Sequence, residues 1–365
     1  MSFAQYLKAV MGIANRYFMK YEIYNTIEDI EKGEWSSLAG DIIPDQQYEW
    51  FQAIEHSIPQ VSPSYVVVRD NGEAKAIAGL YRESQYSIGN LANHPLLTEM
   101  MSTLLGSLTI LEGAAPHSSF SSVFLSGDKT AEKKLFEGLE QLLKREKVIA
   151  LVLENFYEQQ PFQHYGYKEF MMSPNTCVTL KWDSFQDYLN SWSPKRQHSI
   201  VSSIRKGDKE GLKIKYTSSF TGYTEELYQL KKNVGLHHNN PGSILPPQFY
   251  RVCMQYLGDR GEMALCFKDD HVVAFNFSLH TDKVCTVKFV GLDYTHQEAY
   301  YFLYAHAIER GIEKGYQHMY FGRGTYTFKE RLGCSRTGIY SYVKMKNPLL
   351  NLFVTPVLRV SGMST

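Results

Sequence analysis

The chain has 365 residues, of which 44% are hydrophobic, and its 38 basic side chains balance 38 acidic ones. This length suits two domains, and this hydrophobic content is typical of a folded protein and argues against disorder. A net charge of zero gives no general attraction to DNA or to anionic lipid, which leaves only local basic patches as candidates for nucleic-acid contact. The 26 Tyr and 20 Phe side chains favour an aromatic core, and an amphipathic groove for a bulky substrate is the second interpretation.

The five cysteines form no C-x-x-C pair, so no zinc or redox motif is predicted. Their odd number and scattered positions predict free thiols in a reducing cytoplasm. In segment 1–24, Lys8, Arg16 and Lys20 interrupt the apolar residues, which argues against a signal peptide. No run of about 18 apolar residues occurs, so no membrane-spanning helix is expected. We predict no metal site and no tightly bound cofactor.

The N-terminal half is expected to begin with polar helical material up to about Ile58, followed by a β-hairpin. The hairpin strands are expected at residues 64–69 and 74–82, on either side of Asn71-Gly72. An Asn-Gly pair is typical of a type I′ turn because both residues tolerate positive φ.

The rest of this half is expected to combine strands with one helix. The helix begins at Gly127-Asp128 and carries Leu135, Leu139 and Leu142 on one face, as their spacing of four and three indicates. Strands are expected at residues 122–125, 148–153 and 177–182. The second of these is an apolar run typical of a buried central strand.

The segment 183–215 differs from both halves and is interpreted as a crossover between them. An amphipathic helix is expected from Phe185 to Trp192, and Ser193-Pro194 breaks it. A basic helix follows, with Lys195, Arg196, His198, Arg205, Lys206 and Lys209. Such a helix can contact tRNA or a nucleotide-linked acceptor, because phosphate contacts need only Lys and Arg; a solvated basic face is the other interpretation.

The C-terminal half repeats the element order of the first half. Residues 273–279 alternate apolar and polar side chains, which predicts a strand with one buried face. A helix is expected at 297–314, with Tyr301, Ala305, Ile308 and Ile312 on one face and Gly315 as C-cap. Further strands are expected at residues 262–268, 284–290, 318–321 and 338–346. Each half therefore reads as an antiparallel meander, a helix, a parallel-type strand and a closing strand.

Two segments of the chain resemble a known family. They are Tyr188-Leu189-x-x-Trp192-x-x-Lys195-Arg196 followed by Ile204-Arg205-Lys206, and the run from Tyr320 to Gly333. Over about residues 183–346 the chain is similar to the FemAB-like and BioF2-like acyltransferases, which have the GNAT fold. Many members carry two tandem GNAT domains, and the family includes the Fem-type peptidoglycan aminoacyltransferases.

The resemblance implies an α/β (α+β) fold with two tandem GNAT-like domains, each a mixed, mostly antiparallel sheet with flanking helices. The domains are expected at residues 1–182 and 216–365, joined by the crossover, with the active site in the second. In this fold two central strands splay apart, and the following helix begins beside the gap, where its N-terminus favours phosphate. Here residues 290–293 are expected to line the gap and residues 295–298 to cap the helix.

The resemblance also nominates site residues. Phe328-Lys329 matches the family's Phe-Lys pair at the acceptor and acyl channel, so Lys329 is expected to stabilise negative charge; the alternative is a surface lysine on a loop. The predicted catalytic residues are Lys329, Tyr326 and His238. The predicted donor-binding residues are Val290, Gly291, Tyr294, Thr295, His296 and Phe328. The predicted acceptor-binding residues are His237, Asn239, Asn240, Arg323, Lys195 and Arg205.

The sequence departs from the family pattern in two ways. It has no heptad counterpart of the coiled-coil arm seen in some tRNA-using members, and segment 291–297 lacks the repeated glycines of coenzyme A-using GNATs. The favoured hypothesis is an N-acyltransferase that uses acyl-CoA as co-substrate and an amine of a small or peptide-like acceptor. The alternatives are an aminoacyl-tRNA-dependent transferase of Fem type, in cell-wall or natural-product biosynthesis, and a non-catalytic GNAT-fold binding protein.

Overall fold

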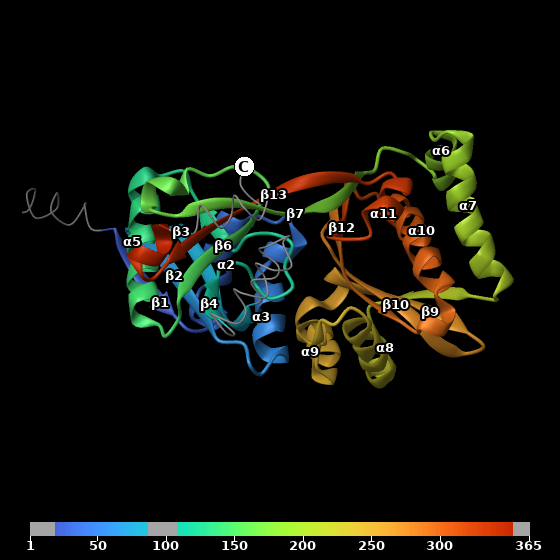
Figure 1. Ribbon diagram of the computed structural model, residues 1–365, viewed down its shortest axis with the longest axis horizontal. Helices are drawn as coiled ribbons and strands as arrows, with labels where there is room; N and C mark the ends of the chain where they lie inside the picture. Colours follow the sequence, from blue (N-terminus) through green and yellow to red (C-terminus); the bar gives the residue numbers. More distant parts are fainter. Residues whose placement is uncertain (1–18, 87–107, 353–365) are drawn as a thin grey trace, which may run out of the picture.

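The computed structural model describes residues 19–86 and 108–352, and the interpretation of Lys8 and Arg16 lies outside these ranges. One continuous 13-stranded sheet runs through both halves of the chain. Its strand order is β1-β2-β3-β4-β6-β13-β7-β12-β11-β10-β9-β8, and β5 pairs with β3. Figure 1 shows the two halves side by side, with helices on both faces of the sheet.

The N-terminal half agrees with most of the expected elements. It contains β1 (Lys20–Tyr24), α2 (Lys32–Ala39), α3 (Tyr48–Ser57), β2 (Pro63–Asp70), β3 (Glu73–Tyr86), β4 (Leu108–Glu112), β5 (Val123–Leu125), α5 (Lys129–Arg145), β6 (Ala150–Phe156) and β7 (Lys168–Thr179). The hairpin turn is confirmed, because Asn71 and Gly72 have φ of 49° and 85°. The helix start is confirmed too, because the Asp128 carboxylate accepts hydrogen bonds from the backbone N–H groups of Thr130 and Ala131. The expectation of only helical material before Ile58 is wrong at β1, which adds an edge strand to β2.

The crossover and the C-terminal half follow. They contain α6 (Phe185–Asn190), α7 (Pro194–Lys209), β8 (Lys213–Thr217), α8 (Thr224–His237), α9 (Pro247–Leu257), β9 (Gly261–Lys268), β10 (His271–His280), β11 (Val284–Leu292), α10 (Glu298–Glu313), β12 (His318–Gly322), α11 (Tyr326–Arg331) and β13 (Ser335–Met345). Pro194 occupies the first turn of α7, where its missing N–H costs nothing. Lys314 is the C-cap of α10, and Gly315 follows it with φ of 73°.

Two expectations for the C-terminal half are corrected. Strand β10 is buried on both faces, since Ala274 and Asn276 are as buried as Phe275 and Phe277; helices cover both sides of the sheet here. Tyr301 was expected on the buried face of α10 but is 44% exposed. Its ring instead packs edge-on against Phe328, with centroids 4.8 Å apart.

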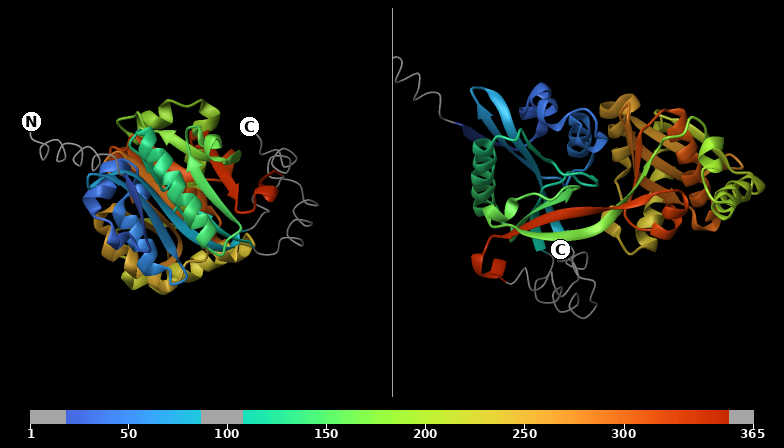
Figure 2. Two further views of the ribbon diagram at one scale, coloured as in Figure 1. Left: turned by 90° about the vertical axis from the view of Figure 1, so that its left-hand side faces the viewer. Right: turned by 90° about the horizontal axis from the view of Figure 1, so that it is seen from above.

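The last strand of the chain crosses between the halves. Strand β13 pairs with β6 from Tyr340 to Met345 and with β7 from Ser335 to Val343, while the end of β7 pairs with β12. Figure 1 and the right-hand view of Figure 2 show β7 and β13 lying along each other across both halves. The domain boundaries at residues 182 and 216 stay a prediction, but each half takes a strand from beyond them.

The two halves also share a hydrophobic core. Helix α3 packs against α9, and the buried rings of Trp50 and Phe249 meet edge to face with centroids 6.3 Å apart. The core continues to Phe277 and Phe289 on the C-terminal sheet. Burying each large side chain stabilises the fold by about 1.5–3 kcal/mol, so this contact fixes one half against the other.

In the described part of the chain, no helix is long and apolar enough to cross a bilayer. The five cysteines are free and buried. Within the same residues, no group of three or more His, Cys, Asp or Glu is arranged to hold a metal ion.

Candidate active site

A β-bulge opens the C-terminal sheet at the centre of the molecule. Strands β11 and β12 pair in parallel only from Val284 to Thr286. On the other side of β11, Phe277 pairs with Phe289 and Ser278 with Val287, which leaves Lys288 as the extra residue of the bulge. A bulge bends its strand and increases its twist. Beyond it, β11 continues to Leu292 without pairing to β12, which is the splay expected for this fold.

A cavity of about 600 Å³ lies in this splay. It is lined by β11, the end of β12, helices α8 and α10, and a loop of the N-terminal half. The cavity brings together six of the predicted site residues, namely Val290, Tyr294, His237, His238, Arg323 and Lys329. They come from four separate segments, and their convergence supports the site without testing the role of any one of them.

The rings at the cavity mouth form a small stack. His237 lies face to face with Tyr294 at 4.0 Å between centroids, and His238 meets His237 edge-on at 5.0 Å. Both histidines lie at the end of α8 and are exposed. The three rings therefore contact one another in the order Tyr294, His237, His238.

Several predicted residues do not line this cavity. Gly291 packs against Phe275 and Leu230, and an added Cβ would lie 2.0 Å from the Phe275 ring. Thr295 hydrogen-bonds to Asp293 through both its N–H and its hydroxyl. Gly291 therefore serves packing, and Asp293 is the N-cap that binds Thr295; at the start of α10 the N-cap residue, Gln297, makes no side-chain capping bond.

The remaining residues outside the cavity lie at its edges or on the surface. Tyr326 donates its hydroxyl to the Pro174 carbonyl at 2.9 Å and lies under the Arg336 guanidinium. His296 lies 3.7 Å from Glu298. Three more are exposed, namely Asn239 and Asn240 in the turn after α8 and Arg205 on α7, and the last two, Lys195 and Phe328, line a second cavity.

Lys329 is neither on a loop nor at the surface, so that alternative is wrong. It lies in α11, is 2% exposed, and donates to the carbonyl oxygens of Phe321, Gly322 and Arg323 at 2.6, 3.2 and 3.2 Å. Burial lowers the pKa of Lys329 to about 8. These bonds fix the turn from β12 into α11, so Lys329 positions the loop that carries Arg323; its catalytic role stays a prediction.

The two glycines of that loop allow its backbone to adopt a left-handed conformation. Gly322 and Gly324 have φ of 74° and 79°, and Thr325 between them and α11 has φ of 45°. A Cβ at either glycine would meet nothing within 4 Å, so space does not require them. The left-handed backbone does, because side chains other than glycine rarely adopt it.

Among the lining residues that the sequence reasoning missed, three carry basic side chains, namely Lys231, Lys288 and His117. Within residues 19–86 and 108–352, Lys231 has no ion-pair partner. It lies on α8, and its Nζ is 5.7 Å from the centroid of Phe289. Burial lowers the pKa of Lys231 to about 8. The signal in the sequence is weak: Lys231 follows Leu227 by four residues, so both lie on the apolar face of the helix.

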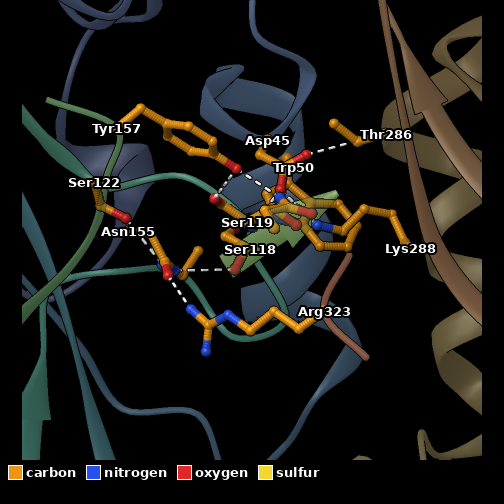
Figure 3. Close-up of polar contacts among 12 residues, drawn as sticks. Asp45, Trp50, Ser118, Ser119, Ser122, Asn155, Tyr157, Thr286, Lys288 and Arg323 are labelled. Carbon is orange, nitrogen blue, oxygen red and sulfur yellow. Dashed lines mark hydrogen bonds and ion pairs between the residues drawn. The ribbon is translucent and has the colours of Figure 1, made fainter. Parts of the chain in front are cut away.

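The second missed residue, Lys288, forms a buried ion pair between the halves. Its Nζ contacts Asp45 of the N-terminal half, and the side chains are 1% and 0% exposed. The Asp45 carboxylate also accepts from the Thr286 hydroxyl at 2.7 Å and the Ser119 N–H at 2.6 Å. Figure 3 shows these bonds converging on Asp45. They attach the bulge of β11 to the N-terminal half.

The third missed residue, His117, reaches the cavity from the loop between β4 and β5. Its φ is 62°, which costs energy in a residue other than glycine and often accompanies function. Its ring meets Phe289 edge-on at 5.3 Å. Burial and the nearby charges of Lys231 and Lys288 lower the pKa of His117 to about 3, so the imidazole is neutral at pH 7.

The N-terminal half also holds the loop of β12. Arg323 donates from Nη2 to Oδ1 of Asn155 at 2.5 Å, and the Asn155 amide donates to the Ser118 carbonyl at 3.1 Å (Figure 3). Asn155 itself has φ of 66°. The cavity is therefore built by both halves of the chain.

A second cavity of about 960 Å³ lies next to the first, between α7, α10 and α11. Lys195 and Phe328 line it, and Tyr301 lines both cavities. Its charged side chains are Lys195, Arg196, Lys206 and Arg331 against Glu298 and Glu330. Since Glu330 pairs with Arg336, the balance favours an anionic ligand.

Comparison with known proteins agrees with this geometry. Residues 194–330 match the family described as acetyltransferase (GNAT) domain. No curated protein sequence matches the chain at a significant level. FemX has a similar fold, with a TM-score of 0.58 at 12% identity over 92% of this chain and 99% of that one. A tandem GNAT protein from the clavulanic acid biosynthesis pathway gives 0.53 at 9% identity over 90% and 99%.

A protein of unknown function from Bacteroides thetaiotaomicron gives a TM-score of 0.52 at 10% identity over 89% of this chain and 99% of that one. At these identities the similar structures show the fold alone. Residues 194–330 match a GNAT acetyltransferase domain, and the whole chain has the fold of tandem GNAT proteins, so the chain is an acyl-transferring enzyme with a tandem GNAT fold. The predicted fold class and the predicted class of enzyme are confirmed.

Proposed function

We propose that the enzyme moves an acyl group from an activated donor, with acyl-CoA favoured, to the amine of a small or peptide-like acceptor. The observation that carries this proposal is the splay between β11 and β12, which opens into the cavity where the predicted residues converge. Backbone N–H groups of β11 beyond Lys288 lack a partner on β12 and are suited to bind a donor carbonyl oxygen.

The reaction needs a proton acceptor for the amine. The amine nitrogen attacks the thioester carbon, one amine proton leaves, the C–S bond breaks, and the sulfur takes up a proton. A general base works best when its pKa lies near the working pH, and the strongly lowered pKa makes His117 a weak base. His238, nominated from the sequence, lines the same cavity and is exposed, so it is the first candidate, and His117 is suited to accept a hydrogen bond from the amine.

Tyr300 is the proposed proton donor to the leaving thiolate. It lines the cavity, and its hydroxyl lies 3.0 Å from the Thr325 hydroxyl. Burial raises the pKa of Tyr300, so its hydroxyl is protonated at neutral pH and can donate a proton to the thiolate as the C–S bond breaks. Tyr326 is worse placed, because its hydroxyl is directed to Pro174, and Tyr294 remains a further candidate in the wall.

The donor's phosphate end is proposed to lie in the second cavity. Its cations flank the start of α10, and helix N-termini favour anions. Tyr301 and Phe328 stand between the two cavities, where they would contact the arm that joins the phosphates to the thioester. With this arrangement the enzyme could bind the phosphates of acyl-CoA even though segment 291–297 lacks the repeated glycines of coenzyme A-using GNATs.

Aminoacyl-tRNA is the second candidate donor, and the basic helix α7 supports it. The two donors predict different footprints. A coenzyme fills the second cavity alone, whereas a tRNA also contacts exposed cations beyond it, such as Arg205.

The first experiment measures turnover. The purified chain is incubated with acetyl- and longer acyl-CoA and a panel of amines, and released thiol is followed together with the mass of the amide. Tyr300→Phe is expected to lower the rate about tenfold or more, as loss of a proton donor does, and Tyr326→Phe is the matched control that keeps it. No thiol and no amide with any donor would refute the coenzyme version.

The second experiment distinguishes the donors. Lys195→Ala and Lys206→Ala remove cations that line the second cavity, while Arg205→Ala removes one from the same helix outside it. For acyl-CoA only the first two variants should weaken binding. For charged tRNA all three should do so, with binding that weakens steeply as salt rises. A donor that binds all three variants like the wild type would remove this cavity from the proposal.

A further inference from the structure

The walls of the first cavity carry an unbalanced positive charge. Lys231, Lys288, Arg323 and Lys329 line it, and no Asp or Glu is among its lining residues. Lys288 is balanced by Asp45 behind it, and Lys329 is surrounded by three carbonyl oxygens. Arg323 donates to Asn155 and lies near the Glu112 carboxyl, so Lys231 is the cation whose charge is left facing the cavity.

Lys231 is built for a partner that the described residues do not supply. It is 7% exposed, and within residues 19–86 and 108–352 its Nζ has no hydrogen-bonding or ion-pair partner. The π face of Phe289 at 5.7 Å is a weak substitute. A buried charge is costly unless it is paired, so an anion in the cavity would gain a strong interaction here.

The chemistry of the proposed reaction says which molecule brings that anion. The donor's phosphates have their own cations in the second cavity. Lys231 lies on the other side of the first cavity, on α8 and beside His117 of the N-terminal half. This side is left for the acceptor, and its cations also favour the uncharged form of a nearby amine, which is the form that attacks.

We propose that the acceptor is a small amine that carries its own anionic group, a carboxylate or a phosphate, and that Lys231 binds this group. The inference rests on the proposed acyl transfer for the identity of the acceptor. The anion site itself does not depend on turnover. A cavity of about 600 Å³ suits a molecule of metabolite size.

The first arm of the test measures anion binding without a donor. The full chain is titrated with sodium acetate or inorganic phosphate at constant ionic strength, with chloride as the balancing ion, and thermal stability is followed. We expect saturable stabilisation by at least one anion, and at least tenfold weaker binding by Lys231→Met. Lys232→Met is the matched control, because Lys232 is next along α8 and lies over Tyr228 instead.

The second arm compares the turnover of matched pairs of acceptors, with acyl-CoA as the donor. Amino acids are compared with their amides, and aminoalkyl phosphates with the corresponding alkylamines, which separates the carboxylate from the phosphate source. The charged member is expected to have about ten- to a hundredfold higher kcat/KM, and Lys231→Met should remove that preference. An enzyme that prefers the uncharged members refutes the inference.

The two arms keep the failures apart. Absence of turnover with every pair counts against the proposed function, and the first arm still decides whether Lys231 is an anion site. Equal anion response in wild type and Lys231→Met, or no response in the wild type, overturns the inference even if turnover is found. Since Met replaces the buried stem of Lys231 without its charge, the variant is expected to fold.

Discussion

The Asp45–Lys288 pair offers the sharpest test of how the halves are joined. Asp45→Asn keeps the shape of the side chain and removes its charge. The amide then faces three donors, from Lys288, Thr286 and Ser119, with a single oxygen to accept them. Lys288 is left 1% exposed and without its counter-ion.

The size of the effect follows from proton release. Breaking a buried pair by removing one partner costs about 3–5 kcal/mol. The protein can limit this cost by releasing the Lys288 proton. From the ordinary lysine pKa of 10.5, neutralising the side chain at pH 7 costs at most about 5 kcal/mol, at 1.36 kcal/mol per pH unit. The expected loss in the free energy of unfolding is therefore about 3–5 kcal/mol.

The pH dependence has a definite sign. In the variant, folded Lys288 has a lowered pKa, so the unfolded chain binds the proton more readily and stability rises with pH. The deficit relative to wild type should shrink by up to about 1.4 kcal/mol per unit between pH 7 and the unfolded pKa. Urea unfolding at pH 7 and pH 9 measures both quantities.

A double variant supplies the control. Asp45→Asn with Lys288→Met removes the stranded charge, and it should recover most of the lost stability. A deficit below about 1 kcal/mol for Asp45→Asn, or no recovery in the double variant, would show that the pair is solvated and would refute the reasoning.

Three other substitutions test the site. Lys231→Met should be about 2–4 kcal/mol more stable than wild type at pH 7, because burial lowers the pKa of Lys231 in the folded protein to about 8. The destabilisation of the wild type by the buried charge is full below pH 8 and decreases as the pH rises towards 10.5. Urea unfolding of both proteins at several pH values measures this difference. Lys329→Met leaves three carbonyls without their donor and should lower kcat at least tenfold; an unchanged rate in a folded protein would contradict its positioning role. Gly324→Ala places a side chain at φ of 79° and should lower stability by about 1–2 kcal/mol with no steric clash, measurable by thermal unfolding.

Local patterns were sufficient for the elements that carry their own signals. The hairpin at Asn71-Gly72, the Asp128 cap and the break at Pro194 each depend on neighbours in the chain. Helix α11 was missed because it follows two glycines, which locally favour a loop. Its order comes from Lys329, whose acceptors lie six to eight residues earlier.

The site was only partly predictable, for the same reason. Phe328-Lys329 and Arg323 were found through a family resemblance, because that resemblance rests on a continuous segment of the sequence. Lys231, Lys288 and His117 line one cavity only because α8, the bulge of β11 and a loop of the other half meet there. Asp45 lies in a short turn of ordinary composition. No residue near it in sequence predicts that it forms a buried ion pair with Lys288, 243 residues away.

The segment that matches the GNAT domain, residues 194–330, is therefore not sufficient to build the cavity. It lacks β7, which pairs with β12, and β13, which joins β7 to β6. It also lacks Asn155, which holds Arg323, and Asp45, which balances Lys288. Three strand pairings join the halves, namely β6–β13, β13–β7 and β7–β12, and through β7 they hold β12 beside the gap. The N-terminal half is thus part of the cavity wall, and it contributes the loop that carries His117 to the space where the acceptor is proposed to lie.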